Sequence, residues 1–135
     1  MLQSELRASE GPGAVDRAGS ALIAEVYPDP ALRIWTRGVS HGLDKRESYK
    51  GPLRGHRRAE LAAVLQSGCP LSDPDGLLQQ CVEEDDYLDA LVCALVARAG
   101  ALGLTEVPRT AEERRLASLE GWIHLPACDL EALTS

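Results

Sequence analysis

The chain has 135 residues, which fits one domain, and its 44% hydrophobic and 26% charged residues are typical of a globular protein. A net charge of −7 argues against a general attraction to nucleic acid. Apolar runs fall short of the roughly 20 residues that a membrane helix needs, and residues 1–20 lack the apolar segment of a signal peptide. We therefore expect a cytoplasmic protein without a membrane partner.

The N-terminal quarter predicts an arm, a strand and a short helix. Residues 1–20 are rich in Gly, Ser, Glu and Pro without hydrophobic periodicity, which indicates a flexible arm. The apolar run at 21–27 predicts a buried strand. Glu25 interrupts this run, and a carboxylate there is costly to desolvate unless it is paired or binds a metal. A helix from Pro30 to Trp35 follows, with Asp29 as its N-cap.

The middle of the chain predicts a polar loop and then helices. Residues 38–53 are expected to form the loop, and a helix should run from about Arg57 to Gln66. Leu77 to Cys81 predicts a helical turn. The most regular segment is Glu84 to about Leu102, where apolar residues recur at spacings of three and four and acidic residues crowd the first turn.

The C-terminal part predicts one more strand. Residues 105–118 form a charged connection, 119–125 is expected to be a short final strand, and 127–135 is a tail. One domain over residues 21–126 then combines two strands with helices, which is an α/β class. Four cysteines occur without a CxxC pair or histidines at zinc-ligand spacing, so we expect reduced structural thiols.

The charge is divided between two segments. Residues 33–58 carry eight basic and two acidic residues, whereas residues 73–89 carry seven acidic residues and no basic one. Like charges that are clustered repel one another, so each segment requires nearby charges of the opposite sign. Either the two solvated segments neutralise each other, or a carboxylate cluster binds cations beside basic residues that bind a polyanion.

Three aspartates share one side of the Glu84–Leu102 helix. At 100° per residue, Asp85 and Asp89 lie about 40° apart, and Asp86 lies about 60° from Asp89. If the strand with Glu25 packs against this helix, the carboxylates repel unless a divalent cation or a shared proton compensates. Mg²⁺ prefers oxygen ligands and suits two or three carboxylates. Alternatively, the aspartates only stabilise the helix N-terminus, and Glu25 faces solvent from an edge strand.

Five segments occur in an order that resembles a known family. They are Glu25-Val26-Tyr27-Pro28, Ala31-Leu32 with Trp35, Tyr49-Lys50-Gly51, Asp85-Asp86-Tyr87-Leu88-Asp89-Ala90-Leu91, and Glu120-Gly121-Trp122-Ile123 with Pro126. Over residues 20–126 this series resembles the predicted nucleases with an RNase H-like fold that form domain-of-unknown-function family 429. The DxxDA sequence at 86–90 is also similar to one on the last core helix of Holliday-junction resolvases in the RNase H-like superfamily.

The resemblance implies hydrolysis of phosphodiester bonds by two Mg²⁺ or Mn²⁺ ions, which activate water and stabilise the leaving oxygen. By this analogy, the catalytic residues are one strand carboxylate and two helix carboxylates: Glu25, Asp86 and Asp89. The metal ligands are the same three residues together with Asp85. The phosphate groups of a DNA or RNA substrate are then bound by basic residues: Lys50, Arg57 and Arg58.

The chain departs from this family at its N-terminal end. Such folds begin with a three-stranded meander that supplies an aspartate to the metal site, and we find nothing similar before Ala21. We therefore expect a partial RNase H-like α/β fold, the C-terminal half, with the meander missing and little or no activity alone. Two alternatives are a non-catalytic remnant that binds a partner or a second copy through an exposed sheet edge, and an acidic domain whose carboxylates only cap a helix.

Overall fold

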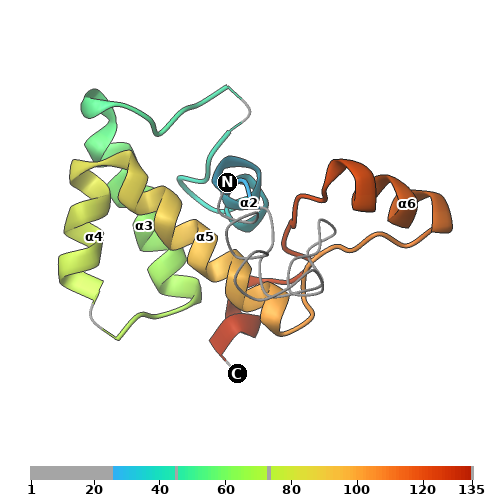
Figure 1. Ribbon diagram of the computed structural model, residues 1–135. Helices are drawn as coiled ribbons and strands as arrows, with labels where there is room; N and C mark the ends of the chain where they lie inside the picture. Colours follow the sequence, from blue (N-terminus) through green and yellow to red (C-terminus); the bar gives the residue numbers. More distant parts are fainter. Residues whose placement is uncertain (1–25, 45, 73, 135) are drawn as a thin grey trace, which may run out of the picture.

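The computed structural model describes residues 26–44, 46–72 and 74–134 (Figure 1). Most of them are helical. The helices are α2 (Pro28–Trp35), α3 (Gly55–Gly68), α4 (Pro74–Glu83), α5 (Asp85–Ala101) and α6 (Ala111–Glu120), with the short 3₁₀ helices η1 (Pro52–Arg54) and η2 (Leu130–Thr134). In the described residues, β-structure is limited to isolated bridges, such as the antiparallel bridge between Thr105 and Pro126. No helix within these ranges is both long and apolar enough to cross a membrane.

The α/β class and the partial RNase H-like fold expected from the sequence are therefore wrong. The described ranges contain no sheet, so a partner surface at a sheet edge has no counterpart there. Residues 21–25 of the first expected strand lie outside the described residues. The expected final strand at 119–125 begins inside α6, and its remainder is extended chain with isolated bridging only.

The sequence contains a helix signal that explains this correction. The Thr110 hydroxyl accepts a hydrogen bond from the backbone N–H of Glu113 at 3.0 Å, which caps α6. Thr110 followed three residues later by Glu113 is the pattern of a capping box, and acidic residues in the first turn favour the helix further. The helix then ends at Gly121, whose φ of +93° suits glycine. The segment expected to be a connection is thus mostly helix.

The other helices are close to their predicted positions. Helix α5 lies against α2, α3 and α4, and its predicted apolar face is buried (Figure 1). Helix α3 is longer than expected at both ends, and α4 extends the expected helical turn. The N-cap of α2 is Tyr27, not Asp29, because Asp29 is already in the first turn and pairs with Arg33. The four cysteines are unpaired.

The two ends of the described chain differ in how they pack. In η2, Leu130 and Leu133 are buried in the helical core, and a Cβ at Gly68 would lie only 2.6 Å from the Leu130 Cβ. This close approach explains why α3 ends on glycine beside η2. Helix α6 instead stands away from the other helices in Figure 1, at the end of two extended segments. Those segments are joined by the bridge at Thr105, whose hydroxyl lies 2.8 Å from Nδ1 of His124.

One charged side chain lies inside the helical core. Arg58 of α3 is only 1% exposed. Its guanidinium donates to the carbonyls of Cys81 and Val82 at 2.7 and 2.5 Å, and to those of Tyr49 and Gly51 at 2.9 and 2.6 Å. A buried charge is tolerated when polar partners replace its water. Arg58 therefore joins α3, the end of α4 and the chain just before η1.

We predict that Arg58→Met lowers the free energy of unfolding by about 3 kcal/mol or more, because carbonyls buried around the guanidinium lose their donor. Urea denaturation followed by circular dichroism measures this change. Arg115→Met is the matched control, since Arg115 is exposed and its nearest ion-pair distance, to Glu112, is 3.7 Å. A loss no larger than that of the control would contradict the structural role of Arg58.

Candidate functional site

The first turn of α5 holds an acidic cluster, Asp85, Asp86 and Asp89. Each offers a carboxylate oxygen, and these oxygens all lie within 4.8 Å of one another. Their helical spacing predicts this convergence. The cluster also lies at the helix N-terminus, where the dipole favours negative charge.

Asp89 is held by two residues of the loop before η1. The Tyr49 hydroxyl donates to Oδ1 of Asp89 at 2.5 Å, and Nζ of Lys50 contacts Oδ2. Burial, together with the hydrogen bond and charge of Asp89, raises the pKa of Tyr49, so this hydroxyl keeps its proton. Partial burial lowers the pKa of Lys50, but the hydrogen bond and charge of Asp89 outweigh it and raise the pKa overall. Lys50 therefore remains a cation beside Asp89.

The other two carboxylates differ in their contacts. Oδ2 of Asp85 accepts a hydrogen bond from the backbone N–H of Gly51 at 2.8 Å. Asp86 is exposed, and its side chain has no hydrogen bond or ion pair with another described residue. Asp85 and Asp89 thus fix the Tyr49-Lys50-Gly51 turn onto α5, whereas Asp86 keeps its oxygens available. Gly51 suits this turn because its φ is +95°.

Glu25 lies outside the described residues, so its approach to Asp89 stays a prediction. The contacts of Asp89 with Tyr49 and Lys50 are not among those predicted from the sequence. Two features of the sequence pointed to these contacts. The segments 33–58 and 73–89 have opposite charges, and the motifs at 49–51 and 85–91 both belong to the series that resembles the family.

The three basic residues expected to bind phosphate have different surroundings. Lys50 lies beside the acidic cluster. The Arg58 guanidinium is buried and bonded to backbone carbonyls, so its charge is turned away from solvent. Arg57 donates to Glu47 at 2.8 Å and to the carbonyls of His41 and Gly42 at 2.7 and 2.5 Å. Both arginines therefore use their donors within the protein.

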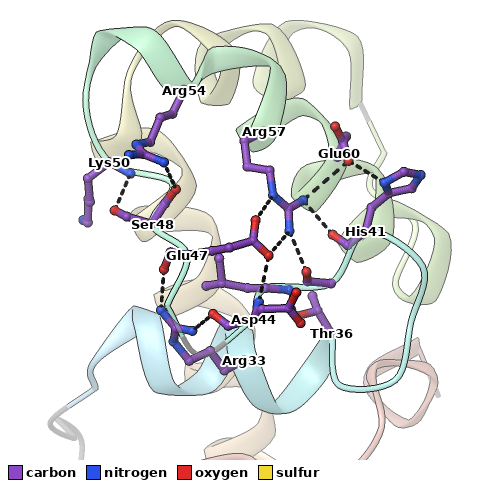
Figure 2. Close-up of polar contacts among 12 residues, drawn as sticks. Arg33, Thr36, His41, Asp44, Glu47, Ser48, Lys50, Arg54, Arg57 and Glu60 are labelled. Carbon is purple, nitrogen blue, oxygen red and sulfur yellow. Dashed lines mark hydrogen bonds and ion pairs between the residues drawn. The ribbon is translucent and has the colours of Figure 1, made fainter.

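Arg57 belongs to a network that orders the loop between α2 and η1 (Figure 2). Its side chain reaches between Glu47 and Glu60, and a carboxylate oxygen of Glu60 also lies 2.8 Å from Nδ1 of His41. Arg33 donates to the carbonyl of Glu47 at 2.7 Å from the α2 side. Hydrogen bonds from Arg57 and from the backbone of Asp44 lower the pKa of Glu47 to about 2. The turn at 49–51 is thus the end of an ordered loop.

The depressed pKa of Glu47 predicts a pH dependence. The stability that its ionised form contributes is complete above the unfolded-state pKa of about 4.3 and disappears as pH falls through the folded-state value of about 2. Melting temperatures of wild type and Glu47→Gln should therefore differ by a constant amount at neutral pH and converge between about pH 4.3 and 2. A difference that does not change over this range would show that Glu47 is not held as an anion.

Comparison with known proteins gives one family. Its description is "Protein of unknown function (DUF429)", and its sequence model matches residues 1–113. The match includes the 49–51 turn, the acidic cluster and residues 1–20, but ends before the segment at 120–126. No curated protein and no solved structure matches the chain. Because the matched residues make up most of the sequence, the chain belongs to the DUF429 family.

Proposed function

We propose that the acidic cluster binds a divalent cation, Mg²⁺ or Mn²⁺, and that the protein uses it to hydrolyse phosphodiester bonds in DNA or RNA. One observation carries the proposal: three carboxylate oxygens converge to within 4.8 Å of one another on a single helical turn. Carboxylates this close repel one another strongly unless a positive charge compensates. Among the residues that the structure describes, Lys50 pairs with Asp89 of this cluster, and no described cation pairs with Asp85 or Asp86.

The arrangement suits one ion of this type. Mg²⁺ binds oxygen at about 2.1 Å, so opposite ligands lie about 4.2 Å apart, which is comparable with the 4.8 Å within which the three oxygens lie. Neither carboxylate oxygen of Asp86 has a partner among the described residues. Asp89 retains accepting capacity, because a carboxylate has about four lone-pair sites and two contacts with described residues use them. Mg²⁺ usually keeps several waters, and these would fill the remaining positions.

Each residue of the site has a role in the proposed reaction. A bound ion supplies an activated water and stabilises charge on the phosphoryl group. Tyr49 positions Asp89 through its hydroxyl, and Gly51 positions Asp85 through its backbone N–H. Lys50 provides a fixed positive charge at the same place, suited to a phosphate oxygen.

We expect slow cleavage from this chain. Two-ion hydrolysis needs ions about 3.5–4 Å apart, and three carboxylates from one turn suit a single ion. Glu25 remains the residue proposed as a further ligand and catalytic carboxylate. The hydrogen bonds made by Asp85 and Asp89 favour a second candidate, in which the cluster is purely structural and only attaches the 49–51 turn to α5.

Asp86 separates the two candidates, because it takes no part in attaching the turn. We predict that Asp86→Asn weakens Mg²⁺ binding at least about tenfold, roughly 1.4 kcal/mol, with an unchanged melting temperature. Asp89→Asn should reduce both metal affinity and stability, because Tyr49 and Lys50 lose a charged partner. Isothermal titration calorimetry and thermal unfolding measure these effects. Cleavage of a labelled single strand in Mg²⁺ or Mn²⁺ should fall in both variants.

Asp129→Asn is the control, because Asp129 is also an exposed carboxylate and lies outside the acidic cluster. Wild-type metal binding that Asp86→Asn leaves intact would contradict the proposed cation site. Absence of any Mg²⁺ or Mn²⁺ binding by the wild type would leave the structural role of the cluster as the explanation.

A further inference from the structure

A hollow of about 520 Å³ adjoins the acidic cluster through Lys50 and Gly51. Residues 50–54, Glu47, His56 and Arg57 line it. Three of these residues are permanently cationic, whereas Glu47 is the one acidic residue. The hollow is therefore basic, although it lies beside the most acidic turn of the chain.

The contacts of these cations decide which of them can bind a ligand. Arg57 is committed to Glu47 and to loop carbonyls, so these two residues largely cancel each other in charge. Arg54 is exposed, and its Nη1 makes one long hydrogen bond of 3.2 Å to the carbonyl of Ser48 (Figure 2). His56 is exposed, and its side chain makes no hydrogen bond or ion pair with another described residue. Arg54 and His56 thus have donors free for a ligand.

The same hollow contains an unusually exposed apolar side chain. Leu53 is 89% exposed, between Pro52 and Arg54 in the single turn of η1. Cationic donors next to an exposed apolar group suit a ligand that combines an anionic group with an apolar surface. A nucleotide unit has this combination in its phosphate and in its sugar and base.

We infer that this hollow binds a phosphate group of a nucleic-acid strand, through Arg54 and His56, next to the phosphate at the acidic cluster. This inference rests on the proposed function, because it extends the substrate from the acidic cluster across Lys50. It assigns phosphate binding to Arg54 and His56, which line the hollow, instead of Arg57 and Arg58, whose donors are used internally. The net charge of −7 means that a strand needs such a local basic surface to bind.

The test is binding of labelled short single-stranded DNA and RNA to the full chain, measured by fluorescence anisotropy in EDTA over a series of salt concentrations. We expect Arg54→Gln to weaken binding about fivefold and to lower the slope of log affinity against log salt by about 1, because one phosphate contact is lost. Arg54→Lys should retain the slope, since it keeps the charge. His56→Gln should weaken binding about twofold, because the ring's hydrogen bond to the phosphate is lost.

Arg109→Gln is the matched control, because it removes the same charge from an exposed arginine outside the hollow. Equal losses in Arg54→Gln and Arg109→Gln would overturn the inference, and so would inorganic phosphate or a mononucleotide binding as tightly as a strand. Unchanged melting temperatures establish that the variants are folded.

The outcome is separable from that of the proposed function. Strand binding that depends on Arg54, without cleavage in Mg²⁺, would support this inference and contradict hydrolysis. If Arg54→Gln changes neither cleavage nor strand binding, this inference is contradicted and the proposed function stands.

Discussion

The arrangement of the site depends on the buried guanidinium of Arg58. No carboxylate of the described residues pairs with this cation, and four backbone carbonyls take the place of its water. Those carbonyls come from two places, residues 49 and 51 and residues 81 and 82. Because α5 begins only three residues after Val82, the same contacts set the distance between the 49–51 turn and the first turn of α5. The hydrogen bonds from Tyr49 to Asp89 and from Gly51 to Asp85 form only when the two segments are this close.

Ion pairs compensate only part of the uneven charge of the sequence. Two arginines of the basic segment pair with carboxylates that lie outside the acidic segment, Arg57 with Glu47 and Arg33 with Asp29. Among the described residues, the direct ion pair between the basic and acidic segments is that of Lys50 with Asp89. Mutual neutralisation therefore accounts for part of the division only. Asp86 has no ion pair among the described residues, and Arg54 lines the hollow that Lys50 also lines, so these two charges are the ones that the proposed cation and phosphate sites use.

The sequence predicted helix α5 well because its apolar spacing is long and regular, and helix geometry alone brings Asp85, Asp86 and Asp89 together. The prediction of a strand at 119–125 was wrong because a short apolar run does not distinguish extended chain from the end of a helix. The capping pattern at Thr110 was the better signal. The contacts of Asp89 with Tyr49 and Lys50 join residues about forty positions apart, and such tertiary contacts leave no local pattern.

Arg57 and Arg58 show how neighbouring residues of one type acquire different roles. Arg58 shares its helix face with Leu61, Ala62 and Leu65, a spacing of three, four and seven that marks the buried side of α3. Arg57 lies about 100° away around the helix and reaches the loop instead. The apolar spacing of α3 was visible in the sequence and could have assigned Arg58 to the interior.

Lys50 connects the two proposed sites energetically. While its ammonium contacts Asp89, a divalent cation must compete with it for that carboxylate, which lowers the apparent metal affinity. Once a cation neutralises Asp89, the charge of Lys50 becomes available to a phosphate in the adjoining hollow, which Lys50 also lines. Cation and phosphate binding would then strengthen each other, and by linkage the effect has the same size in both directions. The pairing of Lys50 with Asp89 in the metal-free protein is therefore compatible with a catalytic site, because it keeps the cluster folded until both ligands arrive.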